Sequence, residues 1–244
     1  MKKIILTCLL VIYSFHFTGC LRTYYPVALK SSAPPSVFNN DEKYDKSVSH
    51  LNATYTFGKG EYDNENYYLY RLGYLIANTK KHFNFNLEGF AYTGNYKVAG
   101  LSESFDGNKS LYALGIDLSI GVNFKIDQVK FGIGSNVGLG GEIGEYYNFR
   151  RSAEDAGLIS ENNQPIFFMV SAYPFFNYQI SDNVSLSTQV NFGIPGVISP
   201  IIQLNGDNYI VWLSWVPQNL SSEIDITERF AMGLMINLNK FSME

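Results

Sequence analysis

Charged residues are scarce in this sequence, at 16% of its 244 residues, whereas average soluble domains carry about 25%. Lys and Arg number 18 against 22 Asp and Glu, so the formal net charge is -4, and losing Lys2 and Lys3 with a leader would make it -6. Nucleic-acid binding needs a basic face. The composition therefore gives no support to that function, and the shortage of Lys and Glu argues against a fold built on amphipathic helices.

Cysteine and histidine are also rare. The two cysteines are Cys8 and Cys20, and His50 and His82 are two of the three histidines. If Cys8 is removed with a signal peptide, Cys20 is the only cysteine left, which excludes an intramolecular disulfide and a metal cluster built from thiolates. We therefore expect neither a metal site nor a cofactor.

The apolar run from Ile4 to Phe17 is too short to cross a bilayer as a helix, which takes about 20 residues. A basic start, this run and the small residues after it form a secretory signal. Phe17-Thr18-Gly19-Cys20 resembles the lipobox of bacterial lipoproteins, although leucine is commonest at the Phe17 position. The resemblance implies that the Cys20 thiol takes a diacylglyceryl group and that Cys20 becomes the mature N-terminus. An ordinary signal peptide that contains a cysteine is the alternative.

Aromatic residues and glycine are abundant, with 18 Tyr, 18 Phe and 21 Gly. From Val48 onward apolar and polar residues alternate with a period of two, which is typical of β-strands. The clearest stretch is 111–124, where Tyr112, Leu114 and Ile116 begin an apolar face opposite small and polar residues. Tilted by about 40°, this strand rises about 30 Å, close to the height of a membrane barrel's apolar band and aromatic girdles.

The same alternation predicts ten strands in all, and no stretch shows a helical period. Asn205-Gly206-Asp207-Asn208 is a strong hairpin signal between two of them. Eight and twelve strands are the alternatives, because the region 195–217 is ambiguous. The predicted strands are 50–57, 67–77, 83–93, 111–124, 129–139, 166–180, 184–194, 198–204, 209–216 and 230–238, of which 166–180 is aromatic on both faces.

Tight connections alternate with longer polar ones, which is the habit of outer-membrane barrels with short periplasmic turns and long outer loops. From Val48 to the end, the chain resembles small porin-like outer-membrane β-barrels. The fold class that we predict is an all-β, antiparallel, up-and-down membrane β-barrel. A soluble, lipocalin-like barrel is the alternative, but its outer wall would carry glycine and small residues where solvated Lys and Glu are expected.

Three regions follow from these patterns: a lipoprotein signal peptide at 1–19, a lipidated N-terminal tether at 20–47 and a β-barrel domain at 48–244. Pro26, Pro34 and Pro35 give the tether an irregular conformation. We expect the protein in the bacterial outer membrane, anchored through Cys20, with the tether in the periplasm beside the first strand. Its expected partners are outer-membrane lipid and other envelope proteins, not nucleic acid.

Four charged residues fall on the polar faces of consecutive predicted strands: Arg71, Glu88, Asp117 and Lys130. An unpaired charge in a narrow lumen is costly, so we expect these side chains to pair across the interior. An ion-pair network that plugs the barrel is one interpretation, and a polar constriction in a pore is the other. Gly138 to Gly141 lacks the residues of a phosphate-binding loop, and close backbone approach explains these glycines better.

The loop 145–164 holds the candidate partner-contact residues Tyr146, Tyr147, Arg150 and Arg151, with a plain solvated loop as the alternative. His50 and His82 map near the periplasmic rim, which disfavours a lipid-modifying hydrolase. We therefore predict a non-enzymatic, lipid-anchored barrel with a structural or accessory role in an envelope assembly and a lumen closed by side chains. A narrow transport pore and a hydrolase are the alternative functions.

Overall fold

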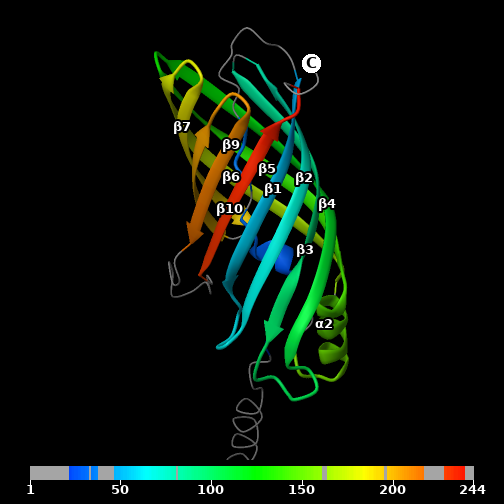
Figure 1. Ribbon diagram of the computed structural model, residues 1–244. Helices are drawn as coiled ribbons and strands as arrows, with labels where there is room; N and C mark the ends of the chain where they lie inside the picture. The colour runs from blue at the N-terminus through cyan, green and yellow to red at the C-terminus, as the bar shows by residue number, and fades with distance from the viewer. Residues whose placement is uncertain are drawn as a thin grey trace, which may run out of the picture.

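The computed structural model is a closed antiparallel β-barrel of ten strands, in which every strand pairs with its neighbour in sequence and β1 pairs with β10 (Figure 1). The structure describes residues 22–32, 34–37, 47–80, 82–160, 164–194, 197–216 and 228–239. The strands are β1 (Ser47–Lys59), β2 (Asn66–Thr79), β3 (Phe83–Val98), β4 (Gly107–Ile126), β5 (Val129–Ile143), β6 (Ile166–Ser181), β7 (Val184–Ile194), β8 (Val197–Asn205), β9 (Tyr209–Val216) and β10 (Arg229–Asn237).

The predicted fold class and strand count are therefore confirmed. The hairpin signal at Asn205-Gly206 does join two strands, β8 and β9, which settles the ambiguous region in favour of ten. The predicted lumen and outer faces are also correct: Leu114 and Ile116 of β4 are exposed, whereas Leu111 and Ala113 are buried. The alternation of period two was sufficient for these predictions because each strand has one face toward the lumen and one away from it.

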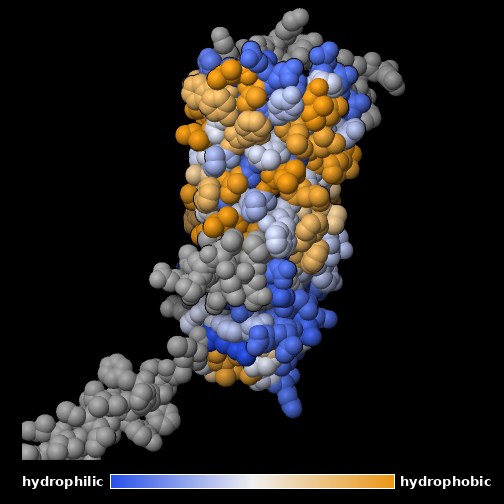
Figure 2. Space-filling view, turned by 90° about the vertical axis from the view of Figure 1, so that its left-hand side faces the viewer, coloured by the Kyte–Doolittle hydropathy of each residue, from blue (hydrophilic) through white to orange (hydrophobic). Residues whose placement is uncertain are grey.

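The outer wall of the barrel is apolar. Leu114 is 69% exposed and Ile116 is 58% exposed, and each of the ten strands exposes large apolar side chains. On β10 these are Met232 and Leu234, whereas Phe230 is half-buried. Figure 2 shows hydrophobic residues over the wall of the barrel, with hydrophilic residues along its upper rim and gathered toward its lower end. A continuous apolar surface of this kind is unfavourable in water and suits contact with lipid.

Glycines of β5 make room inside the barrel for large side chains of β6. Gly132 is the register partner of Phe175, and Gly134 is the partner of Tyr173. A Cβ atom on Gly134 would lie 2.3 Å from the Tyr173 ring, and one on Gly140 would lie 2.3 Å from the Phe167 ring. The aromatic residues of β6 that point inward therefore lie over the β5 backbone, and the close approach predicted for the glycines at 138–141 is confirmed for Gly138 and Gly140.

The α-helix α2 (Glu145–Asp155) lies between β5 and β6, where the sequence predicts only a loop at 145–164. That expectation was wrong. Tyr146, Phe149, Arg150 and Ala153 are its buried residues, at the spacing i, i+3, i+4, i+7 of one helix face. Arg150 interrupts the apolar pattern in the sequence, and so conceals the period. In the part of the chain that is described, no helix is both long and apolar enough to span a bilayer.

The packing of β5 against β6 predicts unequal effects of two alanine substitutions on one strand. In Gly132→Ala the new Cβ would lie 2.0 Å from the Val122 carbonyl oxygen and 2.7 Å from the Phe175 ring. We expect a loss of about 1–3 kcal/mol in the free energy of unfolding, as for other overpacked interiors. Urea unfolding in detergent micelles, followed by tryptophan fluorescence, measures it.

The matched control is Gly141→Ala, whose new Cβ has only the Pro165 carbonyl oxygen within 4 Å, at 3.8 Å. Its stability should equal that of the wild type or exceed it slightly, because alanine has less backbone entropy to lose. Equal stabilities of the two variants would contradict the packing described for β5 and β6.

Candidate functional site in the barrel lumen

The lumen is occupied by the chain's own N-terminal segment. Residues 22–32 and 34–37, here called the luminal segment, include the short 3-10 helix η1 (Val27–Lys30). Most of the segment is buried, with Tyr24, Val27 and Ala28 fully so. Hydroxyl groups join it to the inner wall: Ser31 Oγ lies 2.9 Å from the Tyr92 hydroxyl, and Ser32 Oγ donates to Ser214 Oγ at 3.3 Å. Further along, the Ser36 amide donates to Gln189 Oε1 at 3.1 Å.

The luminal segment begins at the end of the barrel that carries the long connections. Arg22 Nη1 donates to the Ala99 carbonyl at 2.8 Å, between β3 and β4, and the Ser160 amide donates to the Arg22 carbonyl at 2.8 Å, between α2 and β6. The other end, at Val37, belongs to the apolar cluster that contains Leu75 and Trp212. β1 then starts from the tight-turn end, where Ser47 pairs with Asn78.

The sequence pattern predicts a tether in the periplasm beside the first strand, but the described residues of this segment lie inside the lumen, so the prediction was wrong. Prolines, serines and asparagines predicted an irregular tether. The same serines instead pair with hydroxyl and amide groups of the inner wall. Residues 1–21, including the predicted signal peptide and Cys20, lie outside the described residues.

Aromatic and acidic residues hold the luminal segment at the long-connection mouth. The Tyr24 and Tyr96 hydroxyls donate to the two carboxylate oxygens of Glu65, at 2.6 and 2.7 Å. Burial, followed by the hydrogen bond to Glu65, raises the pKa of Tyr24 above its ordinary value. Lys30 Nζ lies 2.8 Å from Glu61 Oε1, and burial raises the pKa of that carboxyl group against the opposing effect of the ammonium. Hydrogen bonds and an ion pair thus join the luminal segment to the residues at this mouth.

A second buried ion pair links the helix α2 to the luminal segment. Arg150 Nη2 donates to Glu142 Oε1 at 2.8 Å, and the Val27 amide donates to Glu142 Oε2 at 3.0 Å. Neither side chain of the pair is exposed to solvent. Tyr146, whose hydroxyl donates to the Tyr25 carbonyl at 3.1 Å, is also fully buried.

Of the four predicted partner-contact residues, two are buried and two are at least partly exposed. Tyr146 and Arg150 face the interior, so they stabilise the mouth of the barrel and offer no surface to a partner. Tyr147 is half-buried and Arg151 is exposed. The helical geometry of α2 explains the division, because residues one position apart on a helix point in different directions.

The predicted charge network forms in part. Arg71 Nη2 lies 2.6 Å from Glu88 Oε2, with both side chains 2% exposed, and Asp117 is the register partner of Glu88 on the next strand. Asn52 Nδ2 donates a hydrogen bond to the other carboxylate oxygen, Glu88 Oε1, at 3.0 Å. Lys130 is not close to this group, because Asp117 is the register partner of Gly138, eight residues or about 26 Å along β5 from Lys130.

Hollows lie between described residues at the inner wall of the barrel. A small one of about 20 Å³ lies between Pro34, Pro35 and the inner wall at Asn86, Glu88 and Asp117. Its volume is sufficient for one water molecule, and the Asn86 amide, which has no hydrogen-bond partner, lies beside it. A larger one of about 370 Å³ lies at the tight-turn end, lined by Lys125, Asp127, Gln128, Lys130, Asn177, Gln179 and Asp182.

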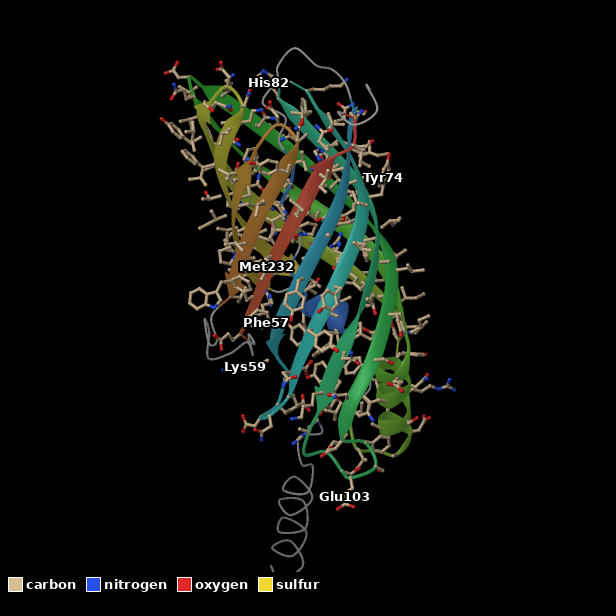
Figure 3. All side chains as sticks on the ribbon, in the orientation of Figure 1. Phe57, Lys59, Tyr74, His82, Glu103 and Met232 are labelled. Atoms are coloured by element: carbon tan, nitrogen blue, oxygen red, sulfur yellow. The ribbon has the colours of Figure 1, made fainter. Side chains whose placement is uncertain are left out.

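Among the described residues, His50 and His82 form no hydrogen bond with a serine. The buried His50 ring has no hydrogen-bond partner, and His82 Nδ1 lies 3.4 Å from the Asn123 carbonyl oxygen. Figure 3 shows His82 at the tight-turn end and Glu103 at the opposite tip, among the long connections. Within the described residues no group of three or more His, Cys, Asp or Glu has the arrangement of a metal site.

No family model matches the chain, and no curated protein matches it. Among solved structures, it is similar to Neisserial surface protein A, with a TM-score of 0.33, 10% identity and coverage of 78% of this chain and 95% of that one. It is also similar to an outer membrane channel from Pseudomonas putida F1 (TM-score 0.41, 5% identity, coverage 83% and 100%) and to the outer membrane enzyme PagL (TM-score 0.33, 11% identity, coverage 77% and 98%). At these scores the likeness carries no argument for a function.

The buried position of Glu88 predicts a large cost for its removal. Glu88→Ala would leave the Arg71 guanidinium buried without its carboxylate, and we expect a loss of about 3–5 kcal/mol in the free energy of unfolding. Urea unfolding of the detergent-solubilised barrel measures the loss.

The control is Glu228→Ala, which removes the carboxylate from the pair with Lys59, in which both side chains are about half exposed. The same substitution should cost no more than about 1 kcal/mol there, because water screens the charges. Similar losses in the two variants would show that the Glu88 pair contributes no more than a surface pair.

Proposed function

We propose that this chain is a lipid-anchored β-barrel of the bacterial outer membrane that has a structural or accessory role in an envelope assembly and whose lumen is closed by its own N-terminal segment. The observation that carries the proposal is the buried path of residues 22–32 and 34–37 through the barrel. A barrel that conducts solutes needs an aqueous path, and a lumen filled by chain and side chains leaves little room for one.

The outer wall supports the membrane location. The exposed apolar face of β4 runs from Tyr112 through Leu114 and Ile116 to Phe124. At about 3.3 Å per residue and a tilt of about 40°, this face is about 30 Å tall, close to an apolar band with aromatic girdles. By the same convention the long connections and α2 face the cell exterior, and the tight turns face the periplasm.

A non-enzymatic role fits the chemistry of the described residues better than the hydrolase alternative does. A serine hydrolase needs a serine and a histidine within hydrogen-bond reach, with a third group that orients the histidine. His50 is instead enclosed by the barrel without a partner, and His82 faces a backbone carbonyl. The exposed Arg151 and half-buried Tyr147 of α2 are our candidates for contact with another envelope protein.

Planar bilayer recordings test the closed lumen. We expect the purified protein to insert without a stable, discrete conductance, and we expect the same of the double variant Ser32→Cys/Ser214→Cys, whose disulfide would fix the luminal segment to β9. A discrete conductance of the wild type would favour the pore alternative. A conductance of the double variant that appears only on reduction would show that the segment moves and gates a pore.

Lipidation is tested by growth with radiolabelled palmitate. We expect Cys20→Ser to abolish incorporation of the label and Cys8→Ser, the matched control within the predicted signal peptide, to retain it. Equal labelling of the two variants would contradict the role of Cys20. The heat-modifiable gel mobility of both variants reports separately on whether the barrel folds.

A further inference from the structure

The chain enters the barrel from the end opposite to the one at which its first strand begins. Arg22 lies among the long connections, held by the Ala99 carbonyl, the Ser160 amide and the Tyr62 ring, whose centroid is 4.5 Å from the guanidinium carbon. β1 starts at Ser47, which pairs with Asn78 beside the tight turn between β2 and β3. The luminal segment therefore crosses the interior from the long-connection mouth toward the tight turns before β1 returns along the wall.

This direction fixes where the mature N-terminus can be. Only two peptide units join Arg22 to Cys20, so their Cα atoms are separated by no more than about 7 Å. β1 has 13 residues, from Ser47 to Lys59. Its length is about 40 Å, and at a tilt of about 40° it separates the two ends of the barrel wall by about 30 Å. Cys20 therefore cannot reach the tight-turn rim while Arg22 holds its position.

Several buried contacts oppose a slide of the luminal segment along the lumen. Tyr24 is fully buried and donates to Glu65, while the Val27 amide donates to Glu142, which is itself paired with Arg150. Any shift of the segment would leave these buried carboxylates with fewer donors, and unsatisfied buried charges are costly. The position of Arg22 is thus set by the barrel and not by the chain before it.

We propose that the mature N-terminus leaves the barrel at the long-connection mouth, and that the acyl chains on Cys20 enter the leaflet around that mouth, which is the outer leaflet of the outer membrane. This inference rests on the proposed function for the lipid at Cys20 and for the orientation of the barrel. It replaces an anchor in the periplasmic leaflet with an anchor on the cell surface.

The test uses single cysteines introduced into the full chain and a membrane-impermeant maleimide applied to intact cells. Tyr25→Cys reports on the N-terminal segment, Glu103→Cys on the long connections and Asp182→Cys on the tight turns; all three side chains are exposed. We expect Tyr25→Cys and Glu103→Cys to be labelled in intact cells. Asp182→Cys should stay unlabelled in intact cells and become labelled after permeabilisation.

The outcomes separate the inference from the proposed function. If Glu103→Cys is labelled in intact cells but Tyr25→Cys only after permeabilisation, the inference is overturned while the membrane barrel stands. If no variant is labelled in intact cells, or if only Asp182→Cys is, the orientation that both ideas assume is wrong. The heat-modifiable mobility of each variant checks its fold, and an epitope inserted between Leu21 and Arg22, detected by antibody on intact cells, gives the same answer without Tyr25→Cys.

Discussion

The structure depends on one constraint: a closed ring of ten strands encloses a narrow space, which must be filled while its buried ion pairs stay intact. Closure satisfies the backbone, since every strand has two hydrogen-bonded neighbours. The interior is then filled in two ways. Glycines on β5 allow the rings of Phe167, Tyr173 and Phe175 to lie across the strand backbone, and the luminal segment fills much of what remains.

Buried charges follow from the same constraint. Arg71 with Glu88, and Arg150 with Glu142, are pairs in which both partners are almost or fully inaccessible to water. Each carboxylate also accepts a hydrogen bond from a further group, Asn52 in the first pair and the Val27 amide in the second. Such pairs add little net stability compared with apolar residues, but they penalise every arrangement that separates them. They therefore specify the register of the wall and the position of the segment inside it.

The barrel could be predicted from the sequence almost strand by strand, because alternation of period two reports directly on which side of a wall each residue faces. Val184–Ile194 and Tyr209–Val216 have the predicted bounds, and the other strands extend beyond theirs at one or both ends. The pairing of Arg71 with Glu88 was also predictable, since adjacent strands bring their polar faces together. Lys130 was wrongly grouped with them, because the order of the strands in the sequence does not say how far along the barrel axis each residue lies.

The contents of the lumen could not be predicted in the same way. The luminal segment has no period, since its contacts are made by single serines and tyrosines with residues up to 182 positions away, as between Ser32 and Ser214. The helix α2 did have a period, with Tyr146, Phe149, Arg150 and Ala153 on one face. A charged residue can belong to a buried face when its partner is fixed opposite, and the sequence gives no sign of that partner before the fold is known.

The pairing of β1 with β10, here called the seam, closes the barrel into a ring that surrounds part of its own chain. Nine residue pairs, from His50 with Asn237 to Gly58 with Arg229, form the seam. If Cys20 carries acyl chains, this bulky end would not pass through a lumen that the segment and side chains of the inner wall occupy. The seam should then close last, around a segment already in place, and opening it should be the only low-energy way to release that segment. The topology of the chain thus constrains the order of assembly as well as the final stability.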